Sequence, residues 1–226
     1  MAALSRVGEI VRTHDPDRFF TSLFAPADKR DALWTLYAFN HEIARAREVV
    51  REPAMALIRL QWWREVIEGA RRRHEVAEPL RAALDAGDLL EADLDAMIEG
   101  RESEAPQSVA EWADYVRATA GALAVAAGRA LGAAEVEGLR AFGAAYGASG
   151  VLRNAALGGE KVPPELAEAG RQWLAEGRRR GVPRPALAAA LPAVLAARDL
   201  RRAAPVRERG AGDKLAVLLA SVTGRL

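Results

Sequence analysis

The feature that most constrains this chain is the spacing of its apolar residues, which recurs every three to four positions in nearly every segment. This spacing follows the 3.6-residue period of an α-helix, and the alternating pattern of a half-buried strand is absent. Gly and Pro fall mainly between the periodic segments, where they mark turns. The sequence therefore predicts an all-α fold.

The periodic segments set the expected helices. They lie at about 3–13, 16–23, 28–50, 54–73, 79–86, 89–102, 108–131, 135–158, 165–180, 184–203 and 212–223. Start signals support three of them: Asp28 before the third, Pro53 in the first turn of the fourth, and Ser108 with Glu111 as a capping box. The stretch from Ala203 to Asp213 is the most loop-like.

The length and composition fit one domain, residues 1–226, because a chain of 226 residues that is half apolar can bury a sizeable core. The absence of cysteine excludes disulfides, zinc-thiolate sites and cysteine nucleophiles. A formal net charge of +1 argues against a nucleic-acid binder, which needs a clear basic excess. Arginine supplies nearly all of the positive charge, so anionic partners stay open.

The N-terminal segment and the longest apolar tract bear on localisation. Arg6 and Glu9 interrupt the N-terminal stretch, so it resembles neither a secretory signal nor an organelle-targeting peptide. The longest apolar tract, residues 186–197, is too short to span a bilayer and contains Pro192. We expect a cytoplasmic protein, for which peripheral membrane contact remains open.

The segment LYAFNHEIARAREVV, residues 36–50, poses the main functional question. Tyr37, His41, Ala44 and Glu48 share one face of its helix. Two carboxylates four residues apart on that face would make a magnesium–diphosphate site, because Mg²⁺ prefers hard oxygen ligands. Ala44 removes the first of these carboxylates.

The next helix carries tandem tryptophans. Its expected apolar stripe is Met55, Ile58, Trp62 and Val66, widened by Trp63 and Ile67. Gln61, Arg64, Glu65 and Glu68 are expected on the opposite, polar side. Tandem tryptophans on a helix are typical of a core, although a polar cluster beside them could line a cleft.

Three further patterns are weak. Glu91, Asp95 and Glu99 recur every four residues, which suits a cation site but equally a solvated face. The histidines at 14, 41 and 74 show no ligand spacing, so we expect no zinc site. Gly-rich and Ala-rich runs at 121–132 and 143–150 indicate close helix packing, or room left for a ligand.

Several segments together resemble the squalene/phytoene synthase family, the all-α head-to-head prenyltransferases. They are DRFFTSLFAPADKRDALWTLYAF, WADYVRATAGALAVAAGRALG and AFGAAYGASGVLRNAALGGEKVPPE. The resemblance covers about residues 15–170, and the tail from about 203 is less family-like. It implies a single-domain helical bundle of the isoprenoid synthase type.

The resemblance also implies where a site would lie. Active family members hold Mg²⁺ and the substrate diphosphate with an aspartate pair on each of two helices. Here the first pair aligns with Ala44 and Glu48, with Arg45 where a further aspartate is usual, and the second pair aligns with Asn154 and Gly158. One carboxylate, Glu48, therefore survives as a ligand position, and a lone glutamate cannot hold a cluster of metal ions.

AFNHEIA followed by RLQWWRE is closer to the family's non-catalytic branch, the phytoene-synthase-like assembly factors of respiratory complex I and their bacterial relatives. The leading hypothesis is a catalytically silent protein, with no cofactor and no catalytic residue. In this hypothesis it binds a partner protein or an isoprenoid or lipid-like ligand. The pocket-lining candidates are Phe20, Tyr37, His41, Arg45, Glu48, Tyr115 and Asn154. The alternative is a Mg-dependent prenyltransferase that condenses isoprenyl diphosphates, with Glu42, Glu48 and the acidic stripe as replacement ligands.

Overall fold

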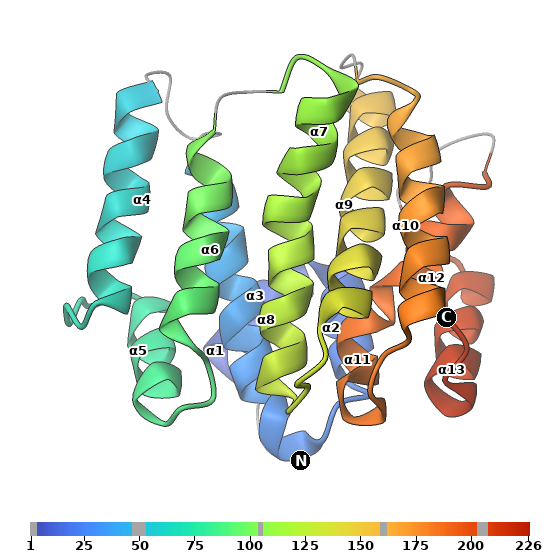
Figure 1. Ribbon diagram of the computed structural model, residues 1–226. Coiled ribbons are helices and arrows are strands. Elements are labelled where there is room, and N and C mark those ends of the chain that lie inside the picture. The colour runs from blue at the N-terminus through green and yellow to red at the C-terminus, as the bar shows by residue number, and fades with distance from the viewer. Residues whose placement is uncertain (1–3, 47–52, 104–105, 159–161, 203–207) are drawn as a thin grey trace. The chain divides into compact units, whose positions relative to one another are not determined.

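The computed structural model describes residues 4–46, 53–103, 106–158, 162–202 and 208–226, and every regular element in these ranges is helical (Figure 1). The all-α prediction is confirmed. The chain groups into two compact units, Met1–Ser103 (unit 1) and Glu104–Leu226 (unit 2), which are described separately. The expectation of a single domain stays a prediction.

Unit 1 is built around one central helix. It contains α1 (Arg6–His14), α2 (Pro16–Ser22), a 3-10 turn (Ala27–Lys29), α3 (Arg30–Ala44), α4 (Pro53–Ile67), α5 (Ala77–Asp85) and α6 (Glu91–Glu102). Residues 32–39 of α3 are all buried, because α1, α2, α4, α5 and α6 each contact this helix. A helix that is apolar on all sides is stable only in such a surrounded position.

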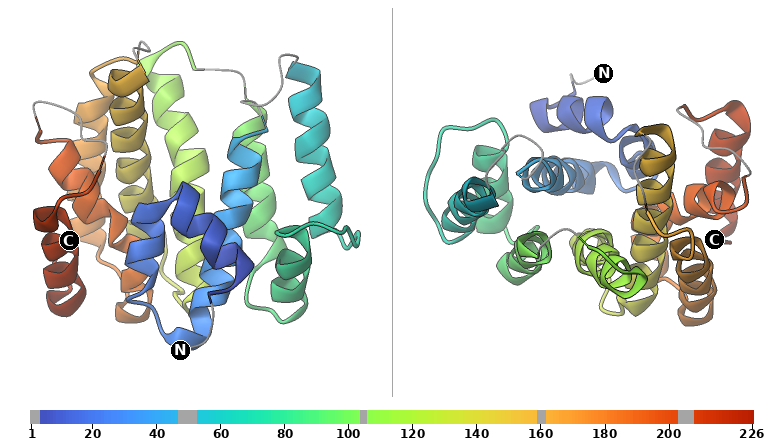
Figure 2. Two further views of the ribbon diagram at one scale, coloured as in Figure 1. Left: turned by 180° about the vertical axis from the view of Figure 1, so that it is seen from behind. Right: turned by 90° about the horizontal axis from the view of Figure 1, so that it is seen from above.

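Unit 2 is organised around α9 (Glu137–Gly158), which contacts the helices before and after it (Figure 2). Before it lie α7 (Val109–Val116), a π-helical turn (Arg117–Gly121) and α8 (Ala122–Ala130). After it lie α10 (Leu166–Arg180), a 3-10 turn (Arg184–Ala186), α11 (Leu187–Ala190), α12 (Pro192–Asp199) and α13 (Ala211–Thr223).

The small residues of unit 2 serve close helix packing. A Cβ atom added at Gly143 would lie 2.5 Å from both the Ala120 carbonyl oxygen and the Ala124 Cβ atom. At Gly147, an added Cβ would lie 2.6 Å from the Ala120 Cβ. The glycines therefore let the backbone of α9 approach the π-turn and α8, which is the packing interpretation of the Gly-rich runs.

Helix boundaries differ from the predicted ones for identifiable reasons. The helix expected at 54–73 ends at Ile67, and Gly69 adopts a positive φ of 118°. The helix expected at 184–203 is divided at Pro192, which has no N–H to donate and begins α12. The third helix begins at Arg30, after the 3-10 turn, and no side chain caps it.

The predicted cap at Ser108 is confirmed. The Ser108 hydroxyl accepts a hydrogen bond from the Glu111 backbone N–H at 3.2 Å. The Glu111 carboxylate reaches one residue further back than in a standard capping box, because it accepts from the Gln107 N–H at 2.7 Å.

The predicted apolar face of α4 is confirmed at Val66, Trp63 and Ile67 and wrong at Met55, Ile58 and the half-buried Trp62. Met55 is 45% exposed and Ile58 is 60% exposed, while Ala56, Leu60, Trp63 and Ile67 form the buried row together with Val66. Apolar residues surround most of this helix, so the sequence offers two alternative faces of similar apolarity. The face that buries Trp63 against Phe39, with ring centroids 5.4 Å apart, is the one that packs.

Candidate functional site

The face of α3 that carries Tyr37 and His41 is covered by α1 and α2. The Arg18 guanidinium of α2 lies over the Tyr37 ring, 5.8 Å from its centroid, and is paired with Asp15 at 2.7 Å. Burial raises the pKa of the Tyr37 hydroxyl, which the positive charge of Arg18 only partly offsets. Tyr37 therefore stays neutral and serves the packing of unit 1.

His41 is half-buried, one turn further along the same face. Its ring stacks on the ring of His14, with centroids 4.2 Å apart. The Nε2 atom of His41 is buried and makes no hydrogen bond to any residue in the described ranges. Burial lowers the pKa of His41, and the nearby His14 lowers it further, so the imidazole is held neutral at pH 7.

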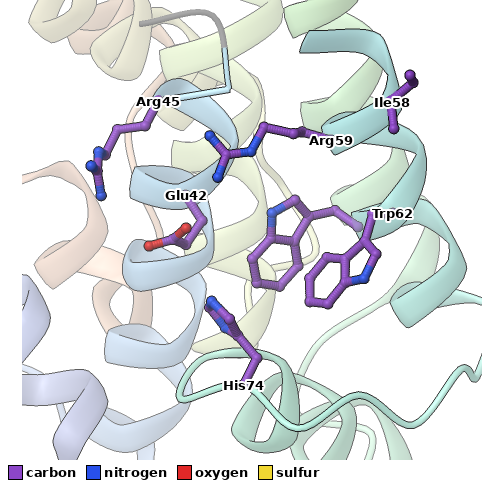
Figure 3. Close-up of a pocket in the computed structure, with 7 residues that line it drawn as sticks. Glu42, Arg45, Ile58, Arg59, Trp62 and His74 are labelled. Carbon is purple, nitrogen blue, oxygen red and sulfur yellow. The ribbon is translucent and has the colours of Figure 1, made fainter. Parts of the chain in front are cut away.

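A separate cleft of about 340 Å³ lies between the C-terminal end of α3 and α4 (Figure 3). Its lining comes from three segments of unit 1: α3 with the residue that follows it, α4, and the loop before α5. The lining residues are Glu42, Arg45, Ile58, Arg59, Trp62, Trp63 and His74.

The charges in the cleft are predominantly positive. Arg45 extends from the end of α3 and Arg59 from α4, and neither forms an ion pair with another residue that the structure describes. Among the described residues of the lining, Glu42 supplies the one carboxylate. Two unpaired guanidinium groups suit a phosphate or carboxylate group, because each can present two parallel N–H donors to it.

The opposite wall of the cleft is aromatic. Trp62 and Trp63 meet edge to face with centroids 4.8 Å apart, and the His74 ring packs edge-on against both, at 5.7 and 5.2 Å. The His74 Nδ1 atom accepts a hydrogen bond from the Val76 N–H at 3.2 Å, which fixes the ring orientation. The cleft therefore combines cationic groups with an apolar wall.

Arginines of α4 and α5 form ion pairs with acidic side chains of α6. Arg64 of α4 lies 3.5 Å from Asp95 and 2.7 Å from Glu102, and Arg81 of α5 lies 3.6 Å from Glu91. Hydrogen bonding to Glu102 raises the pKa of Arg64. Across the described ranges, no group of three or more His, Asp and Glu side chains is placed to hold a metal ion.

The seven pocket candidates occupy different places. Arg45 lines the cleft, Tyr37 and His41 lie earlier on α3, and Phe20 packs edge to face on Phe24 at 5.6 Å. Glu48 lies in 47–52, outside the described residues. In unit 2, Tyr115 packs on Trp112 at 5.8 Å, and Asn154 is exposed on α9.

Sequence reasoning missed most of the cleft lining. Ile58 and Trp62 belong to the predicted core stripe of α4, and His74 follows three arginines that resemble a solvated charge run. Because the loop from Glu68 to Val76 brings His74 back against the tryptophans, no pattern within one helix could have identified the contact. A histidine at the end of a basic loop was the available signal.

Three comparisons with known proteins bear on this fold. The family model described as squalene/phytoene synthase matches residues 11–157. The crystal structure of a dehydrosqualene synthase in complex with ligand superposes with a TM-score of 0.74 over 96% of this chain and 94% of that chain. At 13% sequence identity, this match shows that the two share the isoprenoid synthase fold.

The curated relatives are local matches. The chain is 35% identical over 60 residues to NADH dehydrogenase (ubiquinone) complex I, assembly factor 6 of Homo sapiens, and 33% identical over 60 residues to the Bos taurus protein of the same name. In both cases the match covers 26% of this chain and 18% of the relative. Of the helices described, none is long and apolar enough to cross a membrane.

Proposed function

The chain belongs to the squalene/phytoene synthase family, and on that premise we propose that it is a non-catalytic member that works by binding a partner protein, as an assembly factor does. The family and the fold follow from the comparisons. The cleft at the end of α3 and the local relatives support the proposed lack of catalysis and the proposed partner.

The observation that carries the proposal is the pair of arginines, Arg45 and Arg59, which line that cleft without an ion-pair partner among the residues that the structure describes. Catalysis in this family needs carboxylates that gather Mg²⁺ ions, and the resemblance aligns the first such group with Ala44, Arg45 and Glu48. The two guanidinium groups repel a divalent cation in the same cleft, because all three carry positive charge and water screens them only weakly in a partly enclosed site. The cleft suits an anion better than it suits a metal ion.

The local relatives support the choice of partner. The matched proteins are assembly factors of NADH dehydrogenase (ubiquinone) complex I by name, and the match includes 60 residues of this chain. We propose that this protein likewise assembles with a respiratory NADH dehydrogenase. In this proposal the cleft takes an anionic group without Mg²⁺, either a carboxylate of the partner or the phosphate of a lipid-like ligand.

The catalytic part is tested by direct assay. Purified protein is incubated with farnesyl or geranylgeranyl diphosphate, Mg²⁺ and NADPH, and squalene, phytoene and their cyclopropyl intermediates are sought by mass spectrometry. A dehydrosqualene synthase serves as the positive control. We expect no product; a product that disappears in Glu48→Ala would establish the alternative, a Mg-dependent head-to-head prenyltransferase.

The partner is tested in cells. We expect tagged protein to co-purify with NADH dehydrogenase subunits, and the double variant Arg45→Glu, Arg59→Glu to lose that association while remaining folded. Deletion of the gene is expected to lower the amount of mature NADH dehydrogenase on native gels. Normal NADH dehydrogenase in the deletion strain would contradict the proposal.

A further inference from the structure

The last helix of unit 2, α13, has two opposite apolar faces. Its inner face, with Val217 and Ala220 buried, packs against α12. Its outer face carries a second row at helical spacing: Leu215, Leu218, Leu219 and Val222, which are 55%, 46%, 57% and 71% exposed. Figure 2 shows α13 at the outer edge of unit 2.

A surface helix in water normally carries polar side chains on its outer face. Here the outer row extends over two turns, and Lys214 is the one charged side chain of α13 outside its buried face. The acidic residue of the helix, Asp213, is turned inward, where Arg198 and Arg202 bind its carboxylate. A contiguous apolar row of this kind is a sign of a surface that is covered when the protein works.

The surroundings of this row are basic. In the sequence, residues 198–226 carry a net charge of +4 in a chain whose total is +1. Arg198, Arg202 and Arg209 of this stretch are paired with Asp199 and Asp213, so the cations at the row itself are the exposed ones. Lys214 and Arg225 are exposed at the two ends of the row. Arg178 of α10 donates a hydrogen bond to the Leu226 carbonyl oxygen at 2.7 Å, which places the exposed run Arg178–Arg180 beside the C-terminal end of α13.

From this arrangement we propose that the outer face of α13 docks on the surface of a membrane rich in anionic lipid. Leucines on one face with lysine and arginine at its margins are typical of helices that lie in the membrane interface. The leucines enter the boundary of the acyl region while the cations bind lipid phosphates. A helix of 13 residues is about 20 Å long, too short to span the bilayer, so it would lie flat on it.

A second copy of the chain fits this face less well. Antiparallel pairing of two α13 helices would bring Lys214 near Arg225 of the other copy, and parallel pairing would bring like residues together. A stable protein interface also buries roughly 800 Å² per partner, far more than one row of four side chains provides. Docking of α13 on a membrane would require no catalytic activity.

The experiment is vesicle co-sedimentation of the full chain. One set of vesicles is an equal mixture of phosphatidylglycerol and phosphatidylcholine, and the other is pure phosphatidylcholine. We expect binding to the anionic vesicles alone, weakened severalfold when NaCl is raised from 0.1 to about 0.5 M, because salt screens the lipid charge. Equal binding to both sets, or none to either, overturns the proposal.

Two double variants locate the docking face. Leu215→Ser with Leu219→Ser removes apolar contact, and Lys214→Glu with Arg225→Glu reverses two charges. We expect each double variant to lower the affinity for anionic vesicles at least tenfold. The serines remove the apolar burial of two leucine side chains, and each charge near an anionic surface contributes about fivefold in affinity. Leu90→Ser, at another half-exposed leucine, is the matched control and should bind as the parent does.

Circular dichroism and melting curves establish that the variants are folded, which is expected because the changed side chains are exposed. Wild-type binding by both double variants overturns the assignment of this face. So does a dimer, detected by light scattering, that the leucine variant dissociates without any effect on vesicles, because the occupant would then be a second copy.

Discussion

The imidazole rings of His14 and His41 stack with their centroids 4.2 Å apart and their planes 14° from parallel. They come from the end of α1 and the last turn of α3, so the pair joins the two helices. Two stacked imidazoles can share van der Waals contact while neutral, whereas two imidazolium ions at this distance repel. The contact therefore makes the packing of α1 on α3 sensitive to pH.

The first prediction is a loss of stability on acidification that depends on His41. Burial lowers the pKa of His41, His14 and Arg45 lower it further, and Glu42 and Asp15 act in the opposite direction. Because the folded-state pKa lies below the unfolded value near 6.5, the unfolded chain binds the proton first. Stability is expected to fall as pH drops below about 6.5, until the folded state is protonated too.

Urea unfolding from pH 8 to pH 5 measures this effect. Carboxylates contribute little to the pH dependence over most of that range, since they titrate mainly below it. In His41→Gln the slope of unfolding free energy against pH should be reduced. In His14→Gln the loss of stability on acidification should be smaller than in the parent. An unchanged slope in His41→Gln would show that the stack does not govern the acid response.

The second prediction concerns the approach of α9 to the π-turn and α8. In Gly143→Ala the new methyl group meets the Ala120 carbonyl oxygen and the Ala124 methyl at 2.5 Å, so the helices must move apart. Overpacking of this kind costs about 2 kcal/mol, which lowers the Tm of a chain this long by about 4–8 °C. Calorimetry or circular dichroism would measure it.

Gly150 on the same helix is the matched control, since an added Cβ there has no heavy atom within 4 Å. Gly150→Ala should raise stability by up to about 1 kcal/mol, because alanine favours the helix and restricts the unfolded chain. Opposite signs for the two substitutions would confirm that position 143 is limited by space. Similar effects at both positions would refute it.

The third prediction separates the two tryptophans of α4. Trp63 is 4% exposed and packs on Phe39, so Trp63→Ala should cost about 3–5 kcal/mol through lost burial and a cavity. Trp62 is half-buried in the cleft wall, and Trp62→Ala should cost about 1 kcal/mol. Chemical denaturation would compare them; a larger cost for Trp62→Ala than for Trp63→Ala would mean that α4 buries the other face.

The α4 helix also shows where sequence reasoning stops. The helical period and the fold class could be predicted because they depend on local spacing, and the Ser108 cap because it depends on residues three apart. The choice between two apolar faces of α4 depends on Phe39, which lies outside that helix. The cleft depends on His74, returned by a loop whose geometry no periodicity encodes.

The fourth prediction concerns the ion pairs that hold α13 on α12. The Asp213 side chain is 2% exposed and accepts hydrogen bonds from Arg198 and Arg202. Burial alone would raise the pKa of its carboxyl, but the hydrogen bonds from both arginines and their positive charges together outweigh burial and hold the pKa below its usual value. Asp213→Asn should therefore cost about 1–2 kcal/mol at pH 7, measured by urea unfolding.

The sign of the pH effect follows from that lowered pKa. The stabilisation by Asp213 is complete above the unfolded value near 4 and is lost as pH falls through the lower folded value. The difference in stability between parent and variant should thus begin to shrink below about pH 4 and vanish only below the folded pKa. Glu168→Gln, which removes an exposed pair with Arg171 at 2.8 Å, is the control and should change little.

The last prediction distinguishes an anion cleft from a metal site. Arg45 and Arg59 can bind a diphosphate directly, whereas a prenyltransferase site binds it through Mg²⁺ held by carboxylates. Inorganic pyrophosphate with EDTA should therefore raise the Tm of this protein; at a hundred times the Kd the stabilisation is about 2.7 kcal/mol. Arg45→Ala and Arg59→Ala should each reduce the shift, while Arg12→Ala, an exposed arginine of α1, should not. A Tm shift that requires Mg²⁺ and disappears in Glu42→Ala would instead identify a rebuilt metal site. It would contradict the proposal that the cleft binds an anion without Mg²⁺.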